Sequence, residues 1–134
     1  MFSFSNICFY GGGAWGQALA IALASLGHKS TLIVSDQIRA DEINSHTSKK
    51  FPHIQLSHLI NASVNASETI KKSNLVFVTT ESKRVIDVVK QIFLLKNDNI
   101  SLVITSKGFA TKDGKTFNEI IKDQFPTLKT GILT

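Results

Sequence analysis

The stretch NICFYGGGAWGQALAIALASLGHKSTLIVSD, residues 6–36, decides the fold. A short apolar run ends in three consecutive glycines, and an alanine-rich segment typical of a helix follows at once. Gly11, Gly13 and Gly16 form the pattern G-x-G-x-x-G between this expected strand and this expected helix. Glycine weakens regular structure, so a cluster of glycines here indicates a backbone that turns sharply or approaches a ligand closely. The stretch predicts a dinucleotide-binding strand–turn–helix unit.

Each glycine of the pattern has its own expected role. Gly11 allows the tight turn off the strand, Gly13 lets the backbone approach a pyrophosphate without a Cβ in the way, and Gly16 lets the helix pack closely on the strand. The helix that begins near Ala14 directs its free N–H groups and the positive end of its dipole toward the phosphates. Gly12 occupies a variable position of the pattern. The competing interpretation is a plain glycine turn; the favoured one predicts NAD or NADP as the cofactor.

Strand-like and helix-like segments alternate along the whole chain, without repeats or low-complexity linkers. Expected strands cover residues 6–10, 30–34, 60–64, 75–79, 100–105 and 130–133. Expected helices cover residues 14–26, a segment capped by Ser35 or Asp36 and ending near residue 45, a segment capped by Asn65 or Ser67 and ending at residue 72, and residues 82–95 and 114–124. This alternation predicts an α/β fold, a doubly wound (Rossmann-type), mostly parallel sheet with helices on both faces. Residues 1–134 are expected to form one dinucleotide-binding domain.

The end of the second expected strand supplies the candidates for binding the adenosine ribose. Asp36 lies 20 residues past Gly16, near the position where an acidic residue binds the ribose 2′-hydroxyl. Asp36 is an equally good candidate for the N-cap of the next helix. If Ser35 faces the ribose instead, a 2′-phosphate is admissible and Arg39 has the length to reach it. The residues therefore leave NAD and NADP open.

A second informative stretch is SLVITSKGFATKDGKT, residues 101–116. Its apolar half reads as a buried strand, and Lys107 follows at the carboxyl end of that strand. Ligands bind at this edge of an open α/β sheet, where a lysine can hold a phosphate or polarise a carbonyl. Most lysines are merely solvated, so the residues alone leave both interpretations of Lys107 open.

Composition excludes several other classes of protein. The chain has 134 residues, of which 43% are hydrophobic, and its formal net charge is +5. The basic residues are scattered rather than clustered, so no nucleic-acid surface is predicted. No apolar run approaches the ~18–20 residues of a membrane span, and no G-x-S-x-G pattern supplies a hydrolase nucleophile. The single cysteine, Cys8, indicates a reducing cytoplasm. Four histidines lack the spacing of metal ligands, so no metal site is predicted: His28, His46, His53 and His58.

Three segments together resemble the bacterial-type NAD(P)-dependent glycerol-3-phosphate dehydrogenases. YGGGAWGQALAIALASLGHKSTLIVSD (10–36) is similar to the opening of that family, SNLVFVTTES (73–82) to a later strand, and ITSKGF (104–109) to its lysine–glycine motif. The resemblance covers the whole chain in the family's order. It implies hydride transfer between a nicotinamide and C2 of dihydroxyacetone phosphate or glycerol 3-phosphate, a phosphorylated small-molecule substrate, and a cytoplasmic place in glycerophospholipid metabolism. It predicts no oligomeric state.

The resemblance also assigns roles to individual residues. It implies that Ala14 and Trp15 lie beside the pyrophosphate, that Ser35 lies near the adenosine ribose, and that Lys107 touches both cofactor and substrate. The family usually has Pro-Ser where this chain has Glu81–Ser82. A carboxylate there is unfavourable for an anionic substrate.

The family's general-base lysine belongs to a helical C-terminal domain, which the sequence does not reach. No catalytic residue is therefore expected in residues 1–134, and catalysis by this truncated chain or fragment is expected to be incomplete. The alternatives are a non-catalytic dinucleotide-binding module, such as a decayed gene product, and a fragment of a related hydroxyacid or ketopantoate-type dehydrogenase. The pairs Trp15–Gly16 and Lys107–Gly108 argue against the last.

Overall fold

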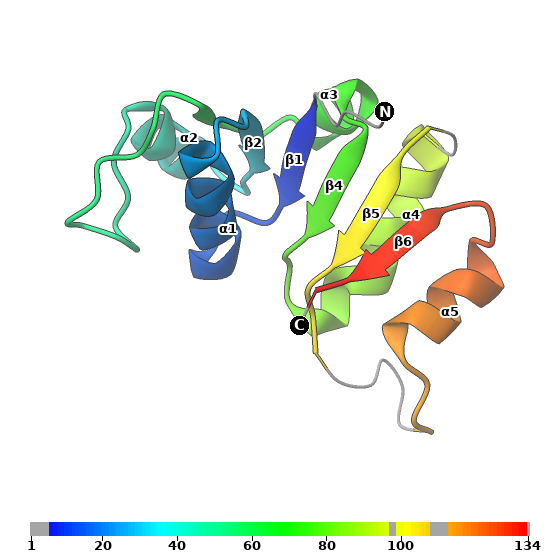
Figure 1. The fold of residues 1–134 in the computed structure, drawn as a ribbon. Coiled ribbons are helices and arrows are strands. Elements are labelled where there is room, and N and C mark those ends of the chain that lie inside the picture. The colour runs from blue at the N-terminus through cyan, green and yellow to red at the C-terminus, as the bar shows by residue number, and fades with distance from the viewer. Residues whose placement is uncertain (1–5, 97–98, 108–112, 134) are drawn as a thin grey trace.

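The computed structural model describes residues 6–96, 99–107 and 113–133. Its strands are β1 (Ile7–Tyr10), β2 (Ser30–Ile33), β3 (Ile60–Ser63), β4 (Leu75–Val78), β5 (Ser101–Ile104) and β6 (Lys129–Ile132). Its helices are α1 (Ala14–Ser25), α2 (Gln37–Asn44), α3 (Ala66–Lys72), α4 (Val85–Leu95) and α5 (Phe117–Gln124), with a 3₁₀ turn at Ser82–Arg84. All six strands run parallel in one sheet, in the order β3-β2-β1-β4-β5-β6 (Figure 1). The predicted doubly wound α/β fold is confirmed.

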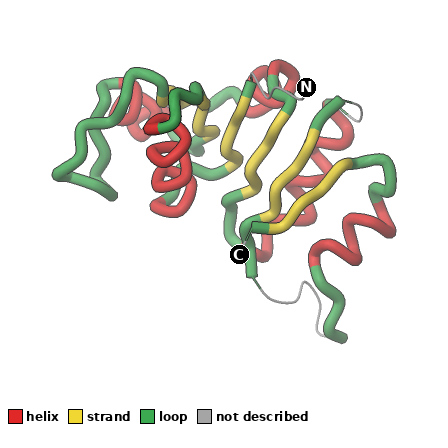
Figure 2. The backbone as a smooth tube through the Cα atoms, viewed as in Figure 1, coloured by secondary structure: helices red, strands yellow, loops and turns green. Residues whose placement is uncertain are grey.

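Alternating side chains along the strands build one hydrophobic core on each face of the sheet. Phe9 packs on the face that α1 and α2 cover, where its ring stacks on that of Phe77 with centroids 4.8 Å apart. Cys8, Val76 and Val78 point to the opposite face and pack against α3, α4 and α5. Figure 2 shows the helices on both sides of the strands. Continuous apolar runs such as Leu75–Val78 are the expected composition of strands buried on both faces.

Three helix boundaries differ from the sequence-based expectation, and local chemistry explains two of them. The last helix begins at Phe117 rather than at residue 114, because Gly114 has a φ of 87° and Thr116 forms a capping box with Glu119. The first helix ends at Ser25, and Gly27 follows in the left-handed conformation with a φ of 88°. The helix expected from residue 82 opens as a 3₁₀ turn and becomes α-helical at Val85.

None of the helices in the described part of the chain is both long and apolar enough to cross a lipid bilayer.

The buried thiol of Cys8 makes the free energy of unfolding depend on pH in the alkaline range. Cys8 is fully buried in β1, and desolvation raises the pKa of its thiol to about 11, against an opposing hydrogen bond with Ser73. The unfolded thiol titrates near its ordinary value of 9.0, so between these two pKa values the unfolded state loses the proton first. The stability contributed by the neutral thiol is complete below pH 9 and is lost as pH rises through 11.

We expect this thiol to lower the free energy of unfolding by about 1.4 kcal/mol between pH 8 and pH 10. Urea denaturation of the wild type and of Cys8→Ala at both pH values measures the difference, since the titrating lysines are common to the two proteins. An equal loss in both proteins would contradict a role for Cys8.

Candidate functional site

A cleft of about 470 Å³ opens where the carboxyl ends of β1, β2 and β4 meet. The order of the strands reverses between β1 and β4, and ligands of doubly wound sheets bind at such a switch point. The loop after β1 contributes Gly11, Gly12 and Gly13, the end of β2 contributes Ser35, and the end of β4 contributes Thr79 and Thr80. The cleft therefore has the position expected of a dinucleotide site.

Gly11 and Gly16 are required by backbone geometry. Gly11 has a φ of +127°, and a Cβ there would stand 2.9 Å from the carbonyl oxygen of Thr79. A Cβ on Gly16 would overlap the carbonyl oxygen of Gly11 and stand 3.0 Å from Thr79 Oγ1. The tight turn and the close packing predicted for these two glycines are confirmed.

The protein itself constrains Gly12 but not Gly13. A Cβ on Gly12 would overlap Cγ1 of Val34, a stiff β-branched side chain that is only 5% exposed. Packing therefore favours glycine at residue 12 of this chain, although the glycine pattern leaves that position variable. A Cβ on Gly13 would meet no atom of the described residues within 4 Å. Since none of these atoms requires glycine there, the free space is available to a ligand that approaches the backbone.

Hydrogen bonds from distant segments fix the shape of the glycine loop. The hydroxyl of Thr79 donates to the carbonyl of Gly11 over 2.9 Å, and the N–H of Gly11 donates to the carbonyl of Ile33 over 3.2 Å. Gln17, only 2% exposed, donates from Nε2 to the carbonyl of Gly12 over 2.8 Å and accepts a hydrogen bond from Ser48 at Oε1. Sequence patterns do not predict the roles of Thr79 and Gln17; the one signal for Gln17 is an amide side chain within an alanine-rich helix. The loop is held in shape by the protein alone.

Two groups at the cleft have hydrogen-bonding capacity for a ligand. The N-cap of α1 is Gly13, which has no side chain to cap the helix, and the first turn contains no acidic residue. Its N–H groups are therefore free to bind an anion such as a pyrophosphate. Thr80 Oγ1 is buried in the cleft wall without a hydrogen-bond partner among the described residues. An orphaned hydroxyl beside a helix N-terminus and the bare backbone of Gly13 fit a dinucleotide.

The predicted site residues do not all reach this cleft. Ala14 and Trp15 lie exposed in the first turn of α1, with Trp15 49% exposed. Lys107 is exposed beyond the end of β5 and does not line the cleft, and Gly108 lies outside the described residues. Gly11, Gly13 and Ser35 are thus brought together, whereas Lys107 stands apart at the same edge of the sheet.

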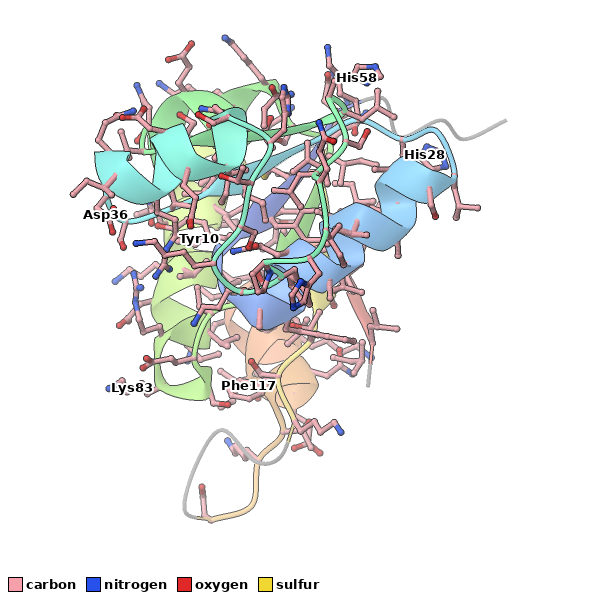
Figure 3. The ribbon with its side chains drawn as sticks, turned by 90° about the vertical axis from the view of Figure 1, so that its left-hand side faces the viewer. Tyr10, His28, Asp36, His58, Lys83 and Phe117 are labelled. Atoms are coloured by element: carbon pink, nitrogen blue, oxygen red, sulfur yellow. The ribbon has the colours of Figure 1, made fainter. Side chains whose placement is uncertain are left out.

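Asp36 serves as a helix cap. Its Oδ1 accepts a hydrogen bond of 2.8 Å from the N–H of Arg39, and it is the N-cap residue of α2. It is not part of the cleft lining, which Ser35 and Arg39 join instead. Figure 3 shows Asp36 at the margin of the molecule beside α2, whereas Tyr10 lies further in. Of the two expected roles of Asp36, capping is confirmed.

The described residues contain no group of three or more His, Cys, Asp or Glu side chains placed to hold a metal ion.

Known proteins resemble this chain in both sequence and fold. A glycerol-3-phosphate dehydrogenase (NAD(P)+) of Halothermothrix orenii is 35% identical over 120 residues, which are 88% of this chain and 35% of that protein. Its counterpart from Exiguobacterium sp. is 30% identical over 135 residues, covering 97% of this chain and 40% of the relative. The crystal structure of glycerol-3-phosphate dehydrogenase from Coxiella burnetii matches 94% of this chain and 39% of its own, with a TM-score of 0.81 at 19% identity.

This chain therefore spans about 35–40% of the length of these relatives. The family model of the NAD-dependent glycerol-3-phosphate dehydrogenase N-terminus matches residues 6–134, which include the glycine loop and all six strands. The resemblance found in the sequence is thereby confirmed, and the chain belongs to the family of NAD-dependent glycerol-3-phosphate dehydrogenase N-terminal domains.

Proposed function

We propose that this chain is the cofactor-binding domain of an NAD(P)-dependent glycerol-3-phosphate dehydrogenase. The observation that carries the proposal is the open backbone of Gly13, at the start of an uncapped helix, inside the cleft at the switch point of the sheet. The loop Gly11–Gly13 and the N–H groups of Ala14, Trp15 and Gly16 hold the pyrophosphate. Thr80 Oγ1 offers a further hydrogen bond from the wall formed by β4.

The nicotinamide cofactor supplies the hydride chemistry, and the protein supplies binding and orientation. Lys107 stands at the same carboxyl edge of the sheet as the cleft, beyond β5, and we assign it to the oxygen atoms of the phosphorylated substrate and to the cofactor. The resemblance supports this assignment through the motif around Lys107. The whole reaction, reduction of dihydroxyacetone phosphate or its reverse, is the activity that we propose for the complete enzyme; this chain spans about 35–40% of the length of its relatives. A cytoplasmic role in glycerophospholipid metabolism is part of the same proposal.

Glu81 favours a second candidate, a non-catalytic dinucleotide-binding module. This carboxylate lines the cleft where the family usually has proline, and it forms an ion pair of 3.3 Å with the exposed Lys83. A negative charge at this wall repels an anionic substrate but leaves the glycine loop intact. Binding of a dinucleotide is common to both candidates, so the glycine loop is the part to test first.

We expect Gly13→Val to lose about 2 kcal/mol or more of dinucleotide binding free energy while the protein stays folded, with only the modest loss of stability that valine causes at an N-cap. A Cβ at residue 13 meets no atom of the described residues within 4 Å, and the φ of −77° suits an L-residue, so the new side chain extends into the space open to the ligand. Calorimetric titration with NADPH and NADH measures binding, and thermal unfolding measures stability.

Gly131→Val in β6 is the matched control, because its Cβ also meets nothing within 4 Å and the residue lies outside the cleft. This variant should bind as the wild type does. A folded Gly13→Val protein with wild-type affinity would overturn the proposed role of the glycine loop.

A further inference from the structure

We propose that the cleft selects the 2′-phosphorylated dinucleotide, NADP(H), over NAD(H), and that Arg39 is the residue that makes the selection. The inference rests on the proposed function and deepens it, since the names of the relatives include both cofactors. It follows from the positions of two charged side chains after β2, the carboxylate of Asp36 and the guanidinium of Arg39.

A carboxylate at the end of the second strand favours NAD by accepting hydrogen bonds from the ribose hydroxyls, and it repels a 2′-phosphate. The Asp36 side chain instead accepts the N–H of Arg39 over 2.8 Å and caps α2, outside the cleft lining. This hydrogen bond engages Oδ1 and anchors the carboxylate to the start of α2. At this end the cleft therefore presents the neutral hydroxyl of Ser35 rather than an acid.

Arg39 supplies a positive charge on the β2 side of the cleft. Arg39 lines the cleft, and its Cδ lies 3.8 Å from the position that a Cβ on Gly12 would take, so its stem passes over the glycine loop. The ion pairs of the described residues join Lys72 to Glu68 and Lys83 to Glu81, and none engages Arg39. Its guanidinium thus keeps its donors for a ligand. Arginine binds phosphate through two parallel N–H···O bonds, a geometry that a ribose hydroxyl does not offer.

The described lining of the cleft contains two arginines, Arg39 and Arg84, and one acid, the exposed carboxylate of Glu81. The lining therefore has a positive balance toward a ligand. The additional phosphate of NADP(H) is attracted to the positive charge of Arg39, on the side of β2. Glu81 lies on the other side of the cleft, after the end of β4. Charge and geometry favour the same cofactor.

Calorimetric titration of the purified chain with NADPH and with NADH tests the proposal. We expect the wild type to bind NADPH about tenfold or more tightly than NADH, since each hydrogen bond to a charged group strengthens binding by about tenfold or more. Arg39→Ala should weaken NADPH binding about tenfold to a hundredfold and change NADH binding less than about threefold. Arg39→Lys keeps the positive charge but loses the two parallel N–H donors of the guanidinium. It should therefore retain part of the preference for NADPH that Arg39→Ala loses.

Two controls separate this role from general effects. Lys122→Ala removes one positive charge from the exposed face of α5 and should leave the ratio of the two affinities unchanged. Asp36→Ala should lower the melting temperature through loss of the cap and leave NADPH preferred.

Equal or tighter binding of NADH by the wild type would overturn the proposal. An Arg39→Ala variant that binds both cofactors more weakly by the same factor would also overturn it. If the wild type binds neither cofactor, the proposed function itself fails, and this result is distinct from a dinucleotide site with the opposite preference.

Discussion

Purified residues 1–134 are expected to bind a nicotinamide dinucleotide and yet to reduce dihydroxyacetone phosphate at least ~10⁴-fold more slowly than a full-length relative. Reduction of a ketone requires a proton donor within hydrogen-bond reach of the reacting oxygen, and the reverse reaction requires a base at the same place. The described lining of the cleft contains no histidine and no lysine, and its one acid, Glu81, pairs with Lys83.

The lack of substrate orientation is expected to slow the reaction more than the lack of a proton donor does. Holding two reactants in register contributes about 7–11 kcal/mol to enzymatic rates, and this requires walls on both sides of the reacting atoms. Lys107 is exposed beyond β5 and does not line the cleft, so these residues offer the substrate a single edge of the sheet. The curated relatives extend to more than twice the length of this chain, which spans 35–40% of them.

The measurement is the absorbance of reduced nicotinamide over time, with dihydroxyacetone phosphate and each of the two cofactors. Lys107→Ala is the companion variant, and calorimetry on the same samples establishes that cofactor is bound. Turnover comparable to that of a full-length relative, abolished by Lys107→Ala, would show that residues 1–134 are a complete enzyme.

Gly16→Val is expected to lower the free energy of unfolding by about 3 kcal/mol. The new Cβ would overlap the carbonyl oxygen of Gly11 and approach Thr79 Oγ1 to 3.0 Å. Neither atom can move alone, because Thr79 Oγ1 is hydrogen-bonded to the same carbonyl of Gly11, and Gly11 N is bound to the carbonyl of Ile33. Relief of the overlap requires α1 to move away from the sheet. The gain in helix propensity from glycine to valine is only a few tenths of a kcal/mol.

Urea denaturation measures this loss, and the same substitution at Gly131 controls for the added volume and β-branching. Gly131→Val should differ little from the wild type, since its Cβ meets nothing within 4 Å. A Gly16→Val protein within about 0.5 kcal/mol of the wild type would contradict the close packing of α1 on the glycine loop.

Sequence patterns were most informative where the determining contacts are local. Continuous apolar runs predicted the strands, and the spacing of Gly11, Gly13 and Gly16 predicted the loop, because both depend on neighbouring residues. The start of α5 differs from the sequence-based expectation because the capping box of Thr116 with Glu119 lies within the segment expected to be helical. Asp36 had two equally plausible roles, and the structure shows the hydrogen bond that makes it a cap.

Sequence patterns do not predict contacts between distant segments of the chain. The constraint on Gly12 comes from Val34, and the orphaned hydroxyl in the cleft belongs to Thr80, which carries no motif of its own. The sequence indicates only that Arg39 is long enough to reach a 2′-phosphate. Its position over the glycine loop depends on how α2 follows β2. The order of the strands likewise depends on pairings that no single segment encodes.

The bond between the Thr79 hydroxyl and the Gly11 carbonyl also bears on the order of events during folding. The two residues are 68 positions apart, so the loop acquires this support only after the chain has returned to place β4 beside β1. Closing so long a segment is slow in comparison with forming α1. A nascent chain that has made only β1, α1 and β2 has the glycine sequence without the support that shapes it. Under the proposed function, the dinucleotide is a ligand of the finished central sheet, and its binding is expected to stabilise the long-range pairing rather than the local turn.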